Sequence, residues 1–425
     1  MRQSTLLLSL LFLLQFNLKA QNDKGITGQN NWMHNWSSFY PQNNNYNSVT
    51  EILSGEIDTN KTLSKRNTYL LMGVVYVTNN AILTIEPGTV IKGDKDSCGT
   101  LVISKGAKIM AEGSLIDPIV FTSTNSSIEC KPGDWGGIIL LGDAPTNNPG
   151  GVARLDFNLN PMLSEYGGVN EHSNSGILKY VRIEYAGRKL NSLKELNGLS
   201  LAGVGNGTVL ENIQISFSND DSLECYGGNV KFNNIISYRA TDDDFDFTQG
   251  AQCTITNSIA IRNPFSSDVS SSRCFEIDSY NVTKNFDFTR LMTHINASNI
   301  TLLNTDFNSQ GLVREAINIQ ENTFFTFTNS VVSGFESLIV MGKKIEATSN
   351  DLSKIQFHNI LINSCEKGFV NELGLTNSAI TKWYNPQVCG LEYDNKSNTD
   401  LFIEFSIQRN PDFRLKNGTG SFASK

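Results

Sequence analysis

Short stretches in which apolar and polar residues alternate fill most of the chain, and Gly, Asn, Asp or Ser separates one stretch from the next. The first of them lie within residues 69–93, 99–113 and 118–123. Alternation with a period of two indicates strands that bury one face, and the frequent turn residues indicate that the chain bends every few residues. No stretch of this region holds a helical period. The pattern therefore predicts an all-β protein built from many short strands.

An Asn recurs at the same position when the stretches are aligned. The column contains Asn212, Asn234, Asn257, Asn299, Asn329 and Asn359, at spacings of 22, 23, 42, 30 and 30 residues. A period of about 20 to 50 residues is typical of a solenoid, in which each unit buries its apolar face against its neighbours. Because the unit consists of strands and tight turns, we expect a single-stranded, right-handed parallel β-helix.

Two structural explanations of the Asn column are open. The amides can form a ladder in which each Asn bonds to the Asn of the next coil. Alternatively, each Asn can adopt the left-handed backbone conformation that a tight turn requires. Neither explanation implies catalysis.

The repeat divides the chain into four parts. They are a signal peptide (1–20), an N-terminal strap or cap (21–68), the β-helix (69–365) and an irregular C-terminal segment (366–425). The strap carries Trp32, Trp36, Phe39 and Tyr40. A β-helix must cover its terminal strand edge, so we expect these rings to pack over the open end of the solenoid rather than to form a sugar-stacking platform.

Residues 1–20 have an early Arg2 and an apolar run from Leu6 to Leu14, as a secretory signal peptide does. The run is far shorter than the roughly 20 residues that cross a bilayer. We therefore expect a secreted or outer-surface protein, with the periplasm as another destination, and no transmembrane segment in the mature chain. The formal charge is −8, from 42 acidic and 34 basic residues, and loss of Arg2 and Lys19 makes it −10. This balance argues against a nucleic-acid partner.

Seven cysteines lie in the exported part, where disulfides persist. We expect Cys98 to pair with Cys130 and Cys365 with Cys389, whereas Cys225 is expected to be a buried thiol because it falls at an apolar position. No CxxC spacing occurs and the four histidines are scattered, which argues against zinc.

A second alignment follows the strand after the turn, through residues 197–205, 220–228, 242–250, 273–278 and 316–320. Strict alternation there directs Glu224, Asp246 and Glu276 outward in one vertical row, with Ser200 and Asn318 at its two ends. Neighbouring strands lie about 4.8 Å apart. Two like charges at that distance repel by about 1 kcal/mol in water and by several times more at a shielded surface.

Three explanations of this acidic row are open: a bound cation, a shared proton, or a solvated surface with local ion pairs. Oxygen-rich turns suit Ca²⁺, which takes 6–8 oxygen ligands. The candidate calcium ligands are Asp221, Glu224, Asp243, Asp246 and Glu276, with Asp220, Asp242 and Asp244 as further oxygen donors. The candidate catalytic residues are Glu224, Asp246, Glu276 and Arg273. Arg273 falls in the column of Asp221 and Asp243, which also suits a structural counter-ion.

Four segments together resemble a known family: LTIEPGTVIKG (83–93), WGGIILLGDAP (135–145), LKYVRIEYAG (178–187) and NGLSLAGVG (197–205). They are similar to secreted right-handed β-helix proteins of Bacteroidetes-type bacteria, over about residues 69–365. The resemblance implies a polysaccharide-lyase-like β-helix fold and an extracellular or cell-surface location. It implies no activity that can be assigned residue by residue.

We therefore expect a secreted or cell-surface binding or scaffold protein that engages a glycan or another envelope protein without catalysis. The alternative is a polysaccharide lyase or glycoside hydrolase that uses the acidic row, with or without Ca²⁺. An enzyme needs a groove over the row with a basic side chain facing it, for which Arg182, Arg239 and Arg273 are candidates. For Arg182, an exposed ion pair with Glu184 is the favoured interpretation. No phosphate-binding or dinucleotide-binding motif is present, so no cofactor besides Ca²⁺ is expected.

Overall fold

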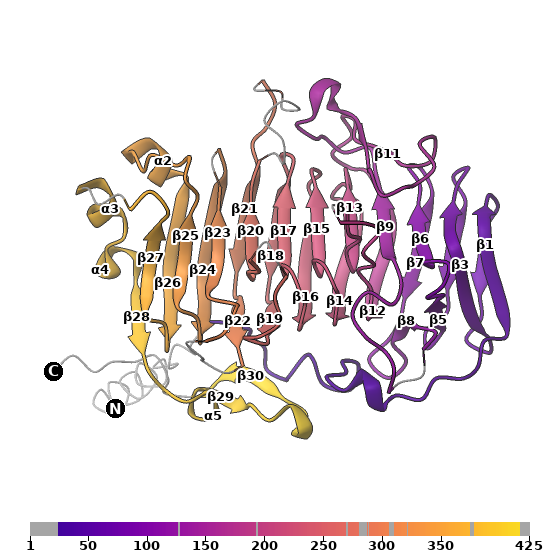
Figure 1. Ribbon diagram of the computed structural model, residues 1–425, viewed down its shortest axis with the longest axis horizontal. Helices are drawn as coiled ribbons and strands as arrows, with labels where there is room; N and C mark the ends of the chain where they lie inside the picture. The colour runs from indigo at the N-terminus through magenta and orange to yellow at the C-terminus, as the bar shows by residue number, and fades with distance from the viewer. Residues whose placement is uncertain are drawn as a thin grey trace, which may run out of the picture.

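The computed structural model describes residues 24–125, 128–192, 194–268, 271–279, 287, 289–305, 310–320, 322–374 and 378–416. In this part of the chain, one network of 26 hydrogen-bonded strands winds along the long axis of the molecule (Figure 1). All pairings within the network are parallel, which confirms the predicted parallel β-helix. The predicted signal peptide lies outside the described residues.

The strands form three parallel sheets, because each coil passes through all three before it reaches the next coil. Sheet 1 contains β5 (Val90–Gly93), β8 (Ile119–Ser123), β19 (Ile259–Arg262), β22 (Thr301–Asn304) and β28 (Leu391–Asp394). Sheet 2 contains β6 (Thr100–Ile103), β9 (Gly137–Leu141), β13 (Leu199–Ala202), β15 (Leu223–Tyr226), β17 (Phe245–Thr248), β20 (Phe275–Ile277), β23 (Glu315–Ile319), β25 (Ser337–Met341) and β27 (Lys367–Asn371). Sheet 3 contains β2 (Lys61–Leu63), β4 (Ile82–Ile85), β7 (Lys108–Glu112), β18 (Gln252–Thr256) and β21 (His294–Ser298).

Longer strands bend at a corner and belong to two sheets. Sheets 1 and 2 share β1 (Glu51–Ile57) and β3 (Thr68–Val77). Sheets 3 and 1 share β12 (Gly176–Glu184), β14 (Val209–Ser216), β16 (Lys231–Tyr238), β24 (Phe324–Ser333) and β26 (Ile355–Asn363).

Smaller elements lie outside the coils. The two antiparallel hairpins are β10 (Ala153–Arg154) with β11 (Glu165–Tyr166), and β29 (Phe402–Glu404) with β30 (Asp412–Leu415). The described helices are α2 (Ser349–Ser353), α3 (Ser378–Trp383), α4 (Pro386–Cys389), α5 (Asn398–Leu401), η1 (Pro41–Asn43), η2 (Pro149–Gly151) and η4 (Ile407–Arg409). The solenoid strands extend from Glu51 to Asp394, beyond the predicted limits of 69 and 365.

The Asn column forms the corner between sheets 3 and 1. Asn212, Asn234 and Asn257 have φ values of 53°, 58° and 49°, in the left-handed region. The Nδ2 atom of Asn234 donates to Oδ1 of Asn212 over 3.0 Å, and Asn257 donates to Asn234 over 2.7 Å. Further along, Asn359 donates to Asn329 over 2.7 Å. The turn conformation and the amide ladder are therefore both present.

Inward side chains of the three sheets form one continuous apolar core along the solenoid. In the middle coils this core is aromatic. The ring centroids of Phe245 and Phe275 lie 5.1 Å apart, those of Phe275 and Phe325 5.7 Å, and those of Phe325 and Phe327 5.7 Å. Cys225 is buried in the same core, as predicted, and burial raises the pKa of its thiol. Such ring stacks favour one register of coil on coil.

The N-terminal strap lies in a place that differs from the prediction. Its Gly25 backbone N–H donates to the carbonyl oxygen of Asn329 (2.8 Å), whereas the backbone N–H of Ser38 donates to Oε1 of Gln214 (2.7 Å). The strap thus runs along the flank of sheet 1, back across the coils (Figure 1). Trp36 and Phe39 are buried there. The physical reason is that the outward residues of sheet 1 are apolar and need a cover. They include Ile236, Ile259, Ile261, Leu303, Val331 and Leu361.

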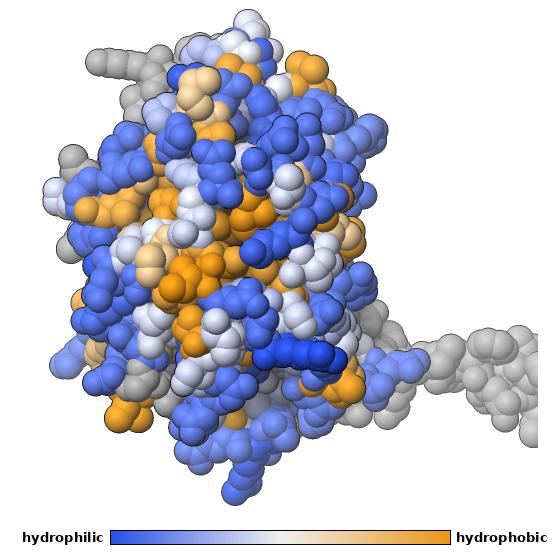
Figure 2. Space-filling view, turned by 90° about the vertical axis from the view of Figure 1, so that its right-hand side faces the viewer, coloured by the Kyte–Doolittle hydropathy of each residue, from blue (hydrophilic) through white to orange (hydrophobic). Residues whose placement is uncertain are grey.

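The open end of the solenoid is therefore not closed by these aromatic residues. Figure 2 views the molecule from the β1 end and shows apolar residues at the centre of the face with a hydrophilic rim. Ile52 of β1 is 57% exposed there.

The two predicted disulfides are absent, and all seven cysteines are free thiols. Each thiol of the predicted pairs has a different neighbour. Cys130 Sγ donates to the Asn125 carbonyl oxygen (3.6 Å), and Cys98 Sγ lies 4.0 Å from the hydroxyl of Thr100. Cys365 and Cys389 donate to backbone carbonyl oxygens at 3.4 and 3.3 Å.

The ladder and the left-handed turn can be separated by substitution. Asn234→Gly keeps the backbone conformation and removes two amide bonds, so we expect a loss of about 1–2 kcal/mol in the free energy of unfolding. Asn234→Ala should lose about 1 kcal/mol more because Ala disfavours the left-handed region. Urea unfolding measures both, with the exposed Asn233→Ala as control. A Gly variant as stable as the wild type would show that the ladder contributes nothing.

Candidate functional site

The acidic row is present on the outer side of sheet 2, in the predicted register. Ser200 pairs with Glu224, Glu224 with Asp246, Asp246 with Glu276, and Glu276 with Asn318. The row arises because each strand starts the same number of residues after its turn. Three successive coils therefore present carboxylates at a strand spacing of about 4.8 Å.

The row is covered at one end, which the sequence did not indicate. Glu224 is only 7% exposed. Nδ2 of Asn197 donates to Oε2 of Glu224 over 2.5 Å, and the hydroxyl of Tyr226 donates to the same oxygen. The ring of Tyr226 in turn contacts Tyr166 of β11, with centroids 6.4 Å apart, so the insertion that carries β10 and β11 lies over this part of sheet 2 (Figure 1). The explanation of the row as a solvated surface is therefore wrong for Glu224.

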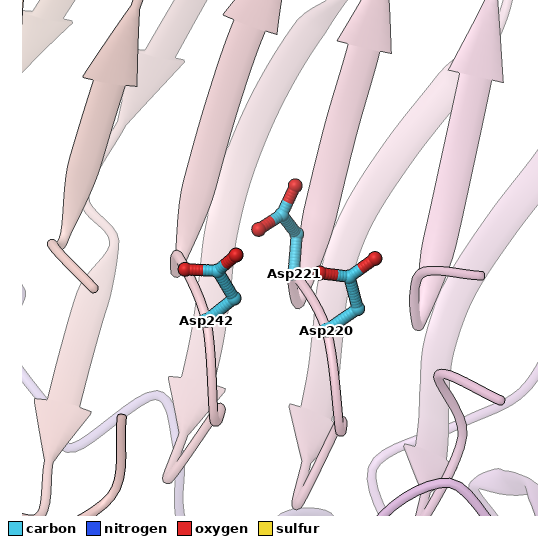
Figure 3. A group of neighbouring side chains, drawn as sticks. All are labelled: Asp220, Asp221 and Asp242. Atoms are coloured by element: carbon cyan, nitrogen blue, oxygen red, sulfur yellow. The ribbon is translucent and has the colours of Figure 1, made fainter. Parts of the chain in front are cut away.

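A second group of carboxylates lies at the turns that lead into sheet 2. Asp220 and Asp221 come from one turn and Asp242 from the next, and their side chains approach one another (Figure 3). One oxygen from each of these three lies within 4.8 Å of the others. The same holds for Asp221, Glu224 and Asp246. Asp221 belongs to both groups, so five carboxylates form one connected cluster, which we call the carboxylate cluster.

The remaining predicted ligands lie beside the cluster and have partners of their own. Arg273 forms ion pairs with Glu276 (3.4 Å) and Glu315 (3.9 Å). Asp243 accepts a hydrogen bond from the backbone N–H of Arg273. Asp244 forms a fully buried ion pair with Arg262 (3.2 Å). Arg273 is thus a counter-ion of Glu276 and Glu315, whereas Asp221, whose column it shares, belongs to the carboxylate cluster.

Two other predicted basic candidates lie away from the row. Arg182 is on sheet 1, where it pairs with Glu184 over 3.4 Å. These side chains are 12% and 2% exposed, so the expected exposed ion pair is in fact buried. The hydroxyl of Tyr46, from the strap, contacts both of them. Arg239 lies over the ring of Tyr238, 5.3 Å from its centroid. Neither Arg182 nor Arg239 comes from sheet 2.

Burial and mutual repulsion raise the pKa values of the cluster. Removal from water is the largest cause for Glu224, and its pKa rises to about 7 although Tyr226 and Asn197 bond to it. Burial, together with neighbouring carboxylates, also raises the pKa values of Asp221 and Asp246 well above the ordinary range. Among the described residues, no Lys or Arg forms an ion pair with Glu224, Asp221 or Asp246. The cluster therefore needs protons or a cation at neutral pH.

Sequence reasoning missed Asn197 and Tyr226. Asn197 stands three residues before Ser200, as Asp221 stands three before Glu224, so the second alignment contained the signal for Asn197. Tyr226 follows Glu224 by two residues and points to the same side of the strand. Its contact depends on the insertion above it, which no local pattern indicates.

Comparison with known proteins agrees with this architecture. The profile of the pectate-lyase-like β-helix domain family matches residues 55–399. The chain belongs to this family. No curated protein matches the chain.

Two solved structures are similar at low identity. One is the enzymatically active domain of tailspike protein 2 of bacteriophage CBA120, with 14% identity, a TM-score of 0.24, and coverage of 72% of this chain and 38% of that one. The other is full-length tailspike protein 2 from an Escherichia coli O157:H7 bacteriophage, with 14% identity, a TM-score of 0.25, and coverage of 72% and 34%. The chain thus spans little more than a third of either tailspike chain.

The raised pKa values predict a distinct dependence of stability on pH. Folded Glu224 keeps its proton up to about pH 7, whereas an unfolded Glu releases it near 4.5. The folded state binds more protons in this window, so the metal-free protein should lose stability as the pH rises through it. Glu224→Gln should flatten the decline, as measured by urea unfolding in chelator at pH 4.5–7.5. Parallel curves for the two proteins would contradict the assignment.

Proposed function

We propose that the protein is a secreted or cell-surface member of the family that binds a glycan and holds Ca²⁺ in the carboxylate cluster. One observation supports the cation: oxygens of Asp221, Glu224 and Asp246 lie within 4.8 Å of one another, and no cationic side chain in the described part of the chain pairs with any of them. The family to which the chain belongs is named after a lyase of a polysaccharide, which supports a glycan as the ligand class.

The donor set fits a hard cation. All the candidate ligands are carboxylate oxygens, which suit a hard cation such as Ca²⁺ better than zinc or copper. Calcium ligands lie about 2.3–2.6 Å from the ion, so two of them are at most about 5 Å apart. The grouping within 4.8 Å satisfies this limit. In addition, Oδ1 of Asp246 is buried and has no hydrogen-bond partner among the described residues. Bound Ca²⁺ would offset two of the negative charges of the cluster and link two adjacent coils.

Binding is favoured over catalysis by the accessibility of the side chains. A general acid or base must reach the substrate directly or through one water. Glu224 is covered by Asn197 and Tyr226, and Arg273 is engaged by Glu276 and Glu315. Asp246 and Glu276 are the partly exposed members of the row, but Asp246 belongs to the carboxylate cluster and Glu276 is paired with Arg273.

A polysaccharide lyase or glycoside hydrolase is the second candidate function. The observation in its favour is the pKa of about 7 for Glu224, next to the carboxylate of Asp246. Glycosidases use such a pair, with one carboxyl group kept protonated as the acid.

The expected signal peptide, which is outside the described residues, and the proposed ligand class support a surface location. In the part of the chain that the structure describes, no helix is long and apolar enough to cross a membrane. A glycan or a second envelope protein is the partner expected at such a location.

Calorimetric titration of the metal-free protein tests the cation. We expect binding with a dissociation constant of about 1 mM or tighter, as extracellular calcium sites show, and a rise in melting temperature with Ca²⁺. Asp246→Asn should weaken binding about tenfold, whereas Asp58→Asn, an exposed site in another coil, should have no effect. No heat and no shift in melting temperature would overturn the proposal.

A polysaccharide screen separates binding from catalysis. The purified protein is incubated with uronic-acid and neutral polysaccharides, and both retention and product release are measured. We expect retention without new reducing or unsaturated ends. Product release that is lost in Asp246→Asn would instead establish the second candidate function.

A further inference from the structure

Sheet 3 differs from sheet 2 in the chemistry of its outer face. Over its last four coils, two columns of outward side chains are in register and none of them carries a carboxylate or an ammonium group. The first column is Thr254, Asn296, Thr326 and Gln356, and the second is Thr256, Ser298, Thr328 and His358. Hydroxyl, amide and imidazole groups thus repeat at the strand spacing of about 4.8 Å.

These columns end in a groove of about 660 Å³ beside the final coil. Its floor consists of the last two residues of each column, and its walls come from α2, α3 and α4, which hold Leu352, Trp383 and Val388 over β26. Lys382 is the one charged residue that lines it among those the structure describes, and no carboxylate does. The volume is within the range of about 300–1,000 Å³ that ligand sites occupy.

Trp383 is fixed as one wall of the groove. Its Nε1 donates to the carbonyl oxygen of Ile355 over 2.7 Å, and its ring meets Phe357 edge to face at 5.8 Å. The indole is half-buried. An aromatic ring held beside hydroxyl and amide groups provides apolar contact and hydrogen bonds together, as a sugar ring requires.

We infer that this groove and the two columns leading to it bind an uncharged polysaccharide chain that lies along the solenoid axis. The inference rests on the proposed glycan-binding function and specifies its ligand class and its contact surface. A chain with many carboxylates would meet one ammonium group here and a protein of net charge −8 around it. A neutral chain meets no repulsive charge here, and the exposed Lys382 keeps its contact with water.

A peptide strand fits this surface less well. Addition of a strand needs free backbone groups along the sheet edge. The edge at residues 355–358 is capped at the Ile355 carbonyl oxygen by Trp383, and α4 packs against the same strand.

The test uses the full mature protein with three neutral probes, a xylan, a mixed-linkage β-glucan and a mannan, and with polygalacturonate as the acidic probe. Affinity electrophoresis and titration with the corresponding oligosaccharides report binding. We expect a neutral probe to bind. Thr328→Arg should weaken this binding at least tenfold, because it places a long charged side chain on the groove floor. Thr84→Arg, an equally half-buried site on sheet 3 near the other end, should change it less than twofold. His358→Ala provides a second, smaller change in the groove.

The outcomes separate the two proposals. Neutral binding that survives chelator and Asp246→Asn but falls in Thr328→Arg supports the groove. Binding of polygalacturonate alone, weakened by Asp246→Asn and not by Thr328→Arg, overturns the inference and leaves the proposed function standing. If the Thr328→Arg and Thr84→Arg variants bind a neutral probe equally well, the inference about the groove is also overturned. Binding of none of the four probes overturns both.

Discussion

Every outward side chain of this protein lies about 4.8 Å from its counterpart one coil away, because parallel strands stack in register. This single constraint determines whether a repeated residue stabilises or destabilises the solenoid. At the corner between sheets 3 and 1 it joins Asn234 to the amides above and below it. In the core it places Phe245 against Phe275. On sheet 2 the same spacing brings Glu224 next to Asp246, where like charges repel.

Repulsion between its carboxylates makes the carboxylate cluster destabilising, and the cluster lies where this repulsion is strongest. Coulomb repulsion grows as water is excluded, and Glu224 is covered by Tyr226 and by the insertion that contains β11. If these carboxylates had only a structural role, a buried ion pair such as that of Asp244 with Arg262 would fill it as well. Asp221 has no such partner among the residues that the structure describes, so protons or a cation must relieve the repulsion within the cluster. Protonation and cation binding depend on pH in different ways, so measurements at several pH values can distinguish them.

Much of the fold could be predicted from the sequence, because the constraint is periodic. The Asn spacing and the alternation of the strands were sufficient for the register of Glu224, Asp246 and Glu276. What the sequence did not indicate depends on contacts between distant segments. The strap covers sheet 1 because outward residues of that sheet, such as Ile236 and Ile261, are apolar. The burial of Glu224 likewise depends on a segment some 60 residues upstream. Disulfide pairs also depend on three-dimensional proximity, and loop composition alone proved a poor guide to it.

The three faces of one coil can carry different chemistry because each inward residue maintains the core while the outward residues are free to vary. Sheet 1 uses that freedom to bind the chain's own strap, sheet 2 to gather carboxylates, and sheet 3 to display uncharged polar groups. Corners between sheets accept insertions without a change of register, as the long segment between β9 and β12 shows. Sheet 2 thus gathers negative charge, whereas the two outward columns of sheet 3 are uncharged over its last four coils. A neutral polymer that follows the axis would meet uncharged donors and acceptors at each coil, so its affinity would grow with the number of coils it spans.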